Sequence, residues 1–242
     1  VPSGRGMPGR PTILQFQPHF LNVVINNSKP LIEAFNNKWV IYDSIKRSMD
    51  EDESLSLERL LREINFHHTK FSRTSHFAPG FARAIIRKFG WSGKRWFDPC
   101  CGWGGRLLAA KFEGCQYSGC DISPLTCGGL LNLNQHIGFD ATILNKSCLE
   151  CEWDGDFVMT SPPFFDIEEY IGGEQPWKKH STREEWQELF VRQFVGKVTV
   201  PAAFYLDEAT KDDFELFRKF DDIFEVQNKR HPRLKAGVEY LC

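Results

Sequence analysis

The sequence predicts an α/β protein with a mostly parallel, doubly wound sheet, an antiparallel C-terminal hairpin and a helical N-terminal extension. From residue 94 onward, short apolar segments alternate with amphipathic helical segments, which is the pattern of a parallel sheet. The composition, 41% hydrophobic and 26% charged, is that of an ordinary globular protein. No run of about eighteen apolar residues occurs, so no membrane-spanning helix is predicted.

The chain is expected to divide into two parts. Residues 1–71 should form a flexible tail followed by a helical region, and residues 72–242 should carry the sheet. The first dozen residues are rich in Gly, Pro and Arg, which favours flexibility. Further along, Ser54 or Ser56 is placed to cap a helix whose leucines recur at helical spacing up to Ile64.

The second part is expected to contain strands at 94–100, 116–122, 140–147, 155–161 and 202–207. Helices are expected at 105–114, 125–139, 183–196 and 211–220, and a basic hairpin at 222–242. Ser181 and Glu184 have the spacing of a capping box for the helix at 183. Because a doubly wound sheet binds ligands beyond the carboxyl ends of its strands, functional residues are expected at those ends.

The first strand ends in "FDPCCGWGGR", where Asp98 is followed by Gly102 and Gly104 before a helix begins. Glycines at this point let the backbone turn tightly and approach a ligand closely. Asp121 ends the next strand, and an acid about twenty residues after such glycines can accept both hydrogen bonds of a ribose diol. The two features together favour a nucleoside-bearing cofactor. A purely structural turn, and a helix N-cap role for Asp121, stay open as alternatives.

The fourth strand ends in Ser161, Pro162, Pro163 and Phe164. The serine hydroxyl and a proline-freed carbonyl can accept hydrogens from an amine, and the aromatic ring can stack on a planar base. Acceptors that draw the amine lone pair out of a heterocycle would make it a better nucleophile. The alternative interpretation is a proline-rich turn over buried phenylalanines.

These motifs resemble those of the amino-methyltransferases that use S-adenosylmethionine. Their cofactor loop, D-P-x-x-G-x-G, matches Asp98-Pro99 and the glycines that follow, and their catalytic motif, (D/N/S)-P-P-(Y/F/W), matches the segment that starts at Ser161. The segment after that motif is similar to bacterial and phage DNA methylases. The resemblance covers residues 72–242 and implies a Rossmann-like class I methyltransferase sheet.

The resemblance also implies the site residues. The cofactor would be held by Asp98, Pro99, Gly102, Gly104, Asp121 and Ile122, with Ser75, Phe77 and Pro79 at its carboxylate end. Ser147 or Cys148 would replace an acid that the family often carries after the third strand. The target base would be held by Ser161, Pro162, Pro163 and Phe164. Apart from the resemblance, Lys178, Lys179, Lys229, Arg230 and Arg233 would lie on the same rim, able to contact phosphates or simply to be solvated.

The activity implied is methyl transfer from S-adenosylmethionine to a nucleobase exocyclic amine, with DNA (cytosine N4 or adenine N6) favoured over RNA. An RNA base, a protein glutamine, or a catalytically silent subunit that binds nucleic acid or a partner are the alternatives. A protein partner could supply target recognition. The eight cysteines lack a second C-x-x-C and are expected to be reduced thiols, with no metal site. No secretory or membrane segment is recognised, so an intracellular location, cytoplasm or nucleus, is expected.

Overall fold

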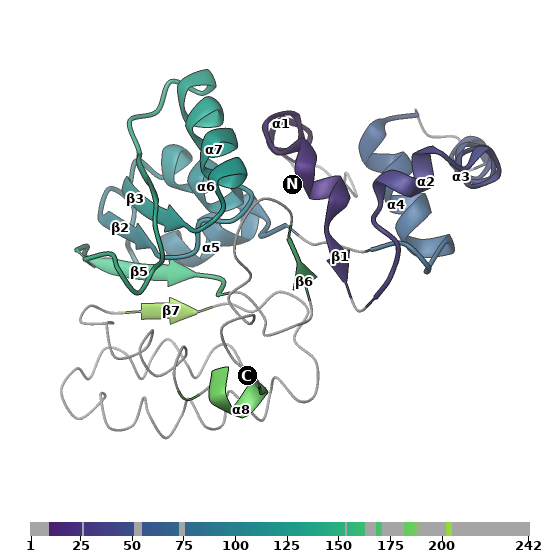
Figure 1. Cartoon of the computed structure of the whole chain (residues 1–242). Helices are drawn as coiled ribbons and strands as arrows, with labels where there is room; N and C mark the ends of the chain where they lie inside the picture. Colours follow the sequence, from purple (N-terminus) through teal and green to yellow (C-terminus); the bar gives the residue numbers. More distant parts are fainter. Residues whose placement is uncertain are drawn as a thin grey trace.

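The computed structural model describes residues 10–25, 27–50, 55–72, 76–152, 154–162, 168–170, 182–186, 188 and 202–204. Its central sheet has five strands in the order β4-β3-β2-β5-β7 (Figure 1). These are β2 (Arg95–Asp98), β3 (Gln116–Asp121), β4 (Thr142–Asn145), β5 (Phe157–Thr160) and β7 (Ala202–Phe204). All four pairings are parallel, so the predicted doubly wound, Rossmann-like α/β class is confirmed.

The sheet reverses its direction of growth at β2. The chain adds β3 and β4 on one side of β2 and then returns to add β5 and β7 on the other. The helices of the first half are α5 (Pro79–Lys88), α6 (Gly105–Phe112) and α7 (Pro124–His136). In doubly wound sheets, ligands bind at the carboxyl ends of the two strands that flank such a reversal, which here are β2 and β5.

The core between sheet and helices explains why these strands read as apolar runs. Trp96 and Phe157 are fully buried on neighbouring strands and their rings stack with centroids 5.4 Å apart. The indole nitrogen of Trp96 donates to the backbone oxygen of Met159 at 2.9 Å, so the one polar atom of that side chain is satisfied. Leu107 and Leu130 pack from α6 and α7 into the same cluster.

The N-terminal region is helical, as predicted. It contains α1 (Arg10–Phe16), the 3-10 helix η1 (Pro18–Asn22), β1 (Val24–Ile25), α2 (Ile32–Phe35), α3 (Lys38–Asp50) and α4 (Leu57–His67). Ser56 caps α4 through a hydrogen bond from the amide of Arg59 at 3.2 Å, which selects it over Ser54. A second apolar core, with Phe20, Leu61 and Ile64 among its buried members, holds this region together.

A short antiparallel pair fastens the N-terminal region to the segment that follows the Ser161 motif. β1 pairs with β6 (Glu168–Glu169), Val24 opposite Glu169. Figure 1 shows this pair and the helices α2–α4 on the side toward which the arrowheads of β5 and β7 point. The hydroxyl of Ser72 accepts from the amide of Ile25 at 3.2 Å, which ties the end of the region back to β1.

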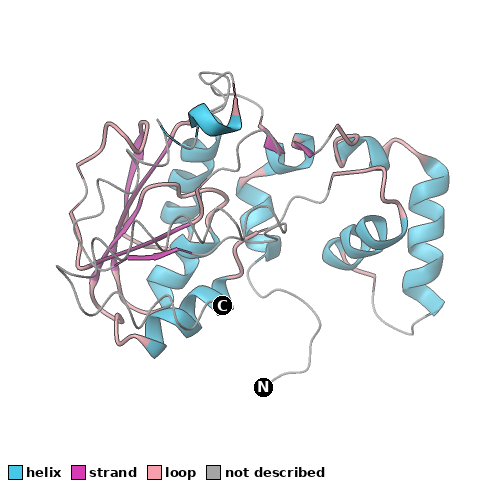
Figure 2. Cartoon of the chain, turned by 90° about the horizontal axis from the view of Figure 1, so that it is seen from below, coloured by secondary structure: helices cyan, strands magenta, loops and turns pink. Residues whose placement is uncertain are grey.

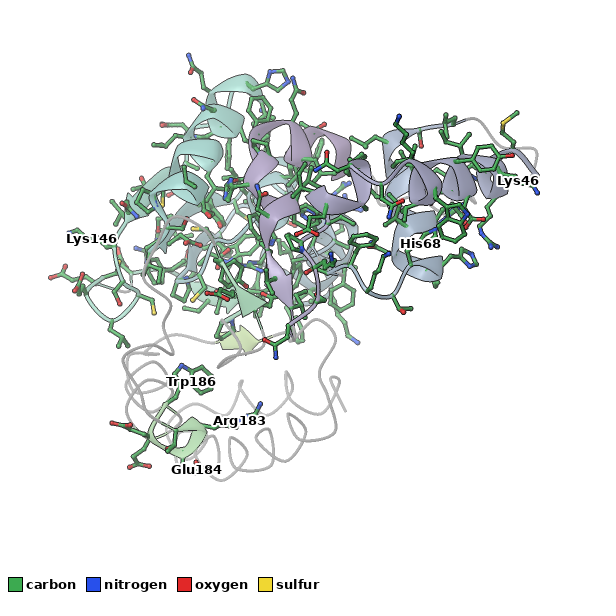
Figure 3. The ribbon with its side chains drawn as sticks, turned by 45° about the vertical axis from the view of Figure 1, so that its right-hand side comes forward. Lys46, His68, Lys146, Arg183, Glu184 and Trp186 are labelled. Carbon is green, nitrogen blue, oxygen red and sulfur yellow. The ribbon has the colours of Figure 1, made fainter. Side chains whose placement is uncertain are left out.

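Several predicted boundaries are wrong by a few residues. α1 begins at Arg10, inside the stretch predicted to be flexible. The cap of α8 (Arg183–Trp186) is Thr182, whose hydroxyl accepts from the amide of Glu185 at 3.1 Å, rather than Ser181. Figure 3 shows Trp186 pointing from α8 toward the rest of the molecule, in agreement with its burial. The helix predicted at 211–220 and the hairpin at 222–242 lie outside the described residues.

The strands β2 to β5 are shorter than their apolar runs suggested, and α6 and α7 end a turn or less before their predicted limits. The view in Figure 2, turned by 90°, shows helices packed beside the magenta strands. In the part of the chain that the structure describes, no helix has the length and apolar character needed to cross a bilayer.

Candidate active site

The loop after β2 is shaped by glycines in the left-handed region. Gly102 has φ 57° and Gly104 has φ 100°, conformations that side chains rarely adopt. A Cβ at Gly104 would also stand 2.9 Å from the Cδ2 atom of Leu133. At Gly105 it would stand 1.9 Å from the backbone oxygen of Phe77, so the loop packs directly against the segment before α5. The predicted tight glycine turn is present, and Gly104 and Gly105 are required in it by close packing within the chain.

Asp121 joins this loop to the end of β3. Its Oδ2 accepts from the amide of Gly102 at 3.1 Å, and its Oδ1 accepts from the amide of Ser123 at 3.0 Å. The N-cap of α7 is Ser123, whose hydroxyl accepts from the amide of Thr126, so the N-cap alternative for Asp121 is wrong. Each carboxylate oxygen keeps a second acceptor position. Burial raises the pKa of this carboxyl.

Asp98 lies at the end of β2, as predicted, but its carboxylate is fully buried among protein donors. Oδ2 accepts from Arg106 Nε at 2.7 Å and from the hydroxyl of Tyr117 at 2.6 Å. Oδ1 accepts from the hydroxyl of Thr160 at 2.7 Å and from the amide of Cys100 at 3.4 Å. These four bonds use the usual acceptor capacity of a carboxylate, so Asp98 connects the protein groups around the site and has no acceptor position left for a ligand.

Ser161 and Pro162 follow β5 directly, and both are half-buried. The residue before them, Thr160, accepts a hydrogen bond from the amide of Cys100 in the glycine loop at 3.1 Å. The strand end that precedes Ser161 and the loop that begins after Asp98 are thus in contact across the reversal point. Pro163 and Phe164, the second half of the motif, lie outside the described residues, as does Ser75.

The other predicted cofactor residues surround the same loop. Phe77 is buried with its ring beneath the guanidinium of Arg106, 5.0 Å from the ring centroid, and Pro79 begins α5. Pro99 is buried, and its carbonyl accepts from the thiol of Cys120 at 3.2 Å. Ile122 is half-buried beside Asp121.

In the loop after β4, Ser147 and Cys148 occupy the positions where the resembled family often carries an acid. The hydroxyl of Ser147 accepts from the amide of Leu149 at 3.3 Å, and Cys148 is buried. A hydrogen bond with Cys148, together with burial, raises the pKa of the Cys100 thiol. Among the described residues, no group of three or more His, Cys, Asp or Glu side chains is arranged to hold a metal ion.

Trp103, for which the sequence predicts no specific role, lies between the two left-handed glycines. Its ring contacts His19 (5.3 Å), Phe20 (5.4 Å) and Tyr170 (5.9 Å), measured between centroids. Trp103 therefore packs the glycine loop against the N-terminal region and against the residue after β6. His19, Phe20 and Tyr170 thus lie beside the glycine loop, which no local motif could indicate. The predicted phosphate contacts Lys178, Lys179, Lys229, Arg230 and Arg233 lie outside the described residues.

No protein-family model and no curated protein matches this chain. Solved structures with a similar fold include a candidate RNA methyltransferase, PH1948, from Pyrococcus horikoshii. It is 16% identical, with a TM-score of 0.43 over 59% of this chain and 65% of that one. The T. thermophilus 16S rRNA N2 G1207 methyltransferase RsmC, in complex with AdoMet and guanosine, is 18% identical, with a TM-score of 0.39 over 56% and 35%.

A methyltransferase from Pyrococcus furiosus is 12% identical, with a TM-score of 0.41 over 82% of this chain and 87% of that one. This chain spans less than two thirds of the Pyrococcus horikoshii and T. thermophilus proteins. At these identities and TM-scores the comparisons assign the chain to no family.

Proposed function

We propose that this chain is an S-adenosylmethionine-dependent methyltransferase that modifies the exocyclic amine of a nucleobase, with cytosine N4 or adenine N6 of DNA as the first candidate. The observation that carries the proposal is that the glycine loop is hydrogen-bonded to two other strand ends. The amide of Gly102 donates to Asp121 Oδ2 at 3.1 Å, and the amide of Cys100 donates to the hydroxyl of Thr160, the residue before Ser161, at 3.1 Å. Cofactor and target base would therefore occupy adjacent places.

The residues present fit this cofactor. Gly102 is half-buried and left-handed, so its backbone could lie against a cofactor at a position where a side chain would be strained. Asp121 keeps one acceptor position on each oxygen, which suits the two hydroxyls of a ribose. The aromatic wall at Trp103 limits access of water from the N-terminal side.

When bound, S-adenosylmethionine supplies a sulfonium methyl whose bond to sulfur breaks as the bond to the amine nitrogen forms, after which the amine loses one proton to water. The chain's part is to hold that amine in line. The hydroxyl of Ser161 and the carbonyl of Pro162 would accept its two hydrogens and direct its lone pair toward the methyl. Phe164 would stack on the base. A target inside a duplex would have to flip out of its stack.

The test has two arms. Calorimetric titration of S-adenosylmethionine and S-adenosylhomocysteine should give micromolar binding to the full chain, and Ser161→Ala should bind equally well. Incubation with single-stranded and duplex DNA and with RNA, followed by mass spectrometry of nucleosides, should give a methylated base with the wild type and none with Ser161→Ala. Absence of cofactor binding would overturn the proposal in favour of a silent subunit. Methylation confined to glutamine side chains would replace the substrate.

A further inference from the structure

A buried group of polar residues crosses the sheet at its reversal point and is not explained by packing. Thr160 ends the apolar strand β5 and is fully buried. Its hydroxyl donates to Asp98 Oδ1 at 2.7 Å and accepts from the amide of Cys100 at 3.1 Å. A valine would fill the same volume, so the hydroxyl is present for these two bonds. Both partners belong to the end of β2 and the loop that follows it.

Arg106 supplies the counter-charge from the first turn of α6. A cation at a helix N-terminus is unfavourable to the helix, because the positive end of the backbone dipole lies there. Its Nε donates to Asp98 Oδ2 at 2.7 Å and its Nη2 donates to the carbonyl of Cys100. Buried ion pairs contribute little net stability, since desolvation offsets their attraction. The arrangement therefore favours a role in geometry over a role in stability.

Tyr117, in β3, is the fourth residue of this buried polar group. Its hydroxyl donates to Asp98 Oδ2 at 2.6 Å. Burial and the negative charge of Asp98 raise the pKa of this phenol well above its ordinary value, so it remains a donor throughout the physiological range. Oδ2 of Asp98 therefore accepts from both Arg106 and Tyr117, which orients the carboxylate whose Oδ1 accepts from Thr160.

We infer that Asp98, Arg106 and Thr160 are positioning residues that fix the separation between the cofactor loop and Ser161. This inference rests on the proposed function and deepens it. Ser161 follows Thr160 directly, and Cys100 lies two residues after Asp98. The two hydrogen bonds of Thr160 therefore connect the cofactor loop to the residue next to Ser161. Asp98 acts on the reaction through Thr160 and the loop, not by touching the cofactor.

The test uses Thr160→Val, Thr160→Ser and the matched control Thr142→Val, all in the full chain. Thr142 is an exposed threonine on β4, which β3 and β2 separate from β5. Single-turnover methylation at saturating cofactor and target should be about 10- to 100-fold slower for Thr160→Val, since a displacement of about 1 Å can cost a factor of about 100. Thr160→Ser, which keeps the hydroxyl, should recover most of the rate, and Thr142→Val should match the wild type.

Cofactor affinity separates positioning from general disruption. The dissociation constant for S-adenosylhomocysteine should change less than about 3-fold in Thr160→Val, because the Gly102–Asp121 contact is left in place. A wild-type rate in Thr160→Val would overturn the inference. So would a Thr160→Ser variant as slow as Thr160→Val, because the hydroxyl would then not be the relevant group.

Failure of the proposed function is distinguishable from failure of this inference. If the wild type methylates no substrate, the proposed function fails, and the inference is judged by amide hydrogen exchange at Cys100 and in peptides that contain Ser161. Exchange should be faster at both places in Thr160→Val and unchanged in Thr160→Ser. Equal protection in all variants would show that the two halves are held apart by other contacts and would overturn the inference.

Discussion

Asp121 is the residue through which the cofactor hypothesis is most directly tested. Its carboxylate lies at the carboxyl end of β3 and holds one backbone amide on each oxygen, Gly102 at 3.1 Å and Ser123 at 3.0 Å. The second acceptor position of each oxygen is the one expected to bind a ribose hydroxyl. Asp121→Asn removes the charge and one acceptor oxygen, whereas Asp121→Ala removes both acceptors and also releases the glycine loop.

The magnitude follows from the number of bonds lost. A hydrogen bond to a charged group contributes about 1.5–3 kcal/mol. Loss of one such bond in Asp121→Asn should raise the dissociation constant for S-adenosylhomocysteine about 10- to 150-fold. Loss of both in Asp121→Ala, about 3 kcal/mol or more, should raise it by at least about 150-fold. Isothermal titration calorimetry covers this range.

The pH dependence supplies an independent check. Because burial raises the pKa of Asp121, its carboxylate takes up a proton at a higher pH than an ordinary aspartate, whose value is about 3.9. Cofactor affinity should therefore fall on acidification above that pH, and Asp121→Asn should lack this dependence. For the cofactor-free protein the sign is opposite: a raised folded-state pKa stabilises the fold at low pH, and this contribution is lost as pH rises through it.

Asp140→Ala is the matched control, because Asp140 is an exposed aspartate in the turn before β4. It should bind the cofactor as the wild type does, and thermal unfolding should confirm that every variant is folded at the titration temperature. Wild-type affinity in Asp121→Ala would show that Asp121 only braces the loop and does not bind the cofactor. Equal losses in Asp121→Ala and Asp140→Ala would refute a binding role for Asp121 as well.

Two further predictions concern stability. Gly128→Ala in α7 meets no atom within 4 Å and should stabilise the fold by about 1 kcal/mol, whereas Gly129→Ala would place a Cβ 2.3 Å from the backbone oxygen of Phe16 and should lower the melting temperature. Similar melting temperatures for the two variants would contradict the packing of α1 on α7. Burial alone would raise the pKa of Glu113, but hydrogen bonds led by Arg87 lower it, so its stabilisation is present at neutral pH and lost as pH falls through the depressed value. Glu113→Gln should lower the unfolding free energy at pH 7 by about 1–3 kcal/mol in urea titrations and flatten its acid dependence, and an unchanged pH profile would contradict this account.

The strands at the centre of the sheet could be predicted because they are buried on both faces. Trp96 and Phe157 lie in short apolar runs closed by a polar residue, a pattern that depends on local sequence alone. The two-residue strands β1 and β6 could not be predicted. Glu168 and Glu169 carry no apolar alternation, and their pairing with β1 depends on contacts across more than half of the chain.

The candidate site was predictable in position but not in detail. The sequence placed Asp98, Gly102 and Asp121 at adjacent strand ends, and the structure brings them together. It could not reveal that Asp98 is saturated by protein donors, because its partner Thr160 is 62 residues away and hydrogen-bond geometry has no local pattern. A buried arginine in the first turn of a helix was the one available indication, since the charge of Arg106 there requires a partner.

The reversal of the sheet accounts for why so few residues connect the two halves of the site. Because β2 and β5 are direct neighbours, the loop after one strand and the motif after the other leave the sheet side by side, and a single hydroxyl at Thr160 can bridge them. The loop after β2 extends beyond the edge of the sheet, and there the ring of Trp103 packs against Phe20 of η1 and against Tyr170. A site built this way depends on backbone placement more than on reactive side chains. Its chemistry should therefore be more sensitive to loss of a buried hydrogen bond at the strand ends than to the loss of a nearby thiol. A hydrogen bond with Cys148, together with burial, raises the pKa of Cys100, and burial raises the pKa of Cys101, so both stay protonated.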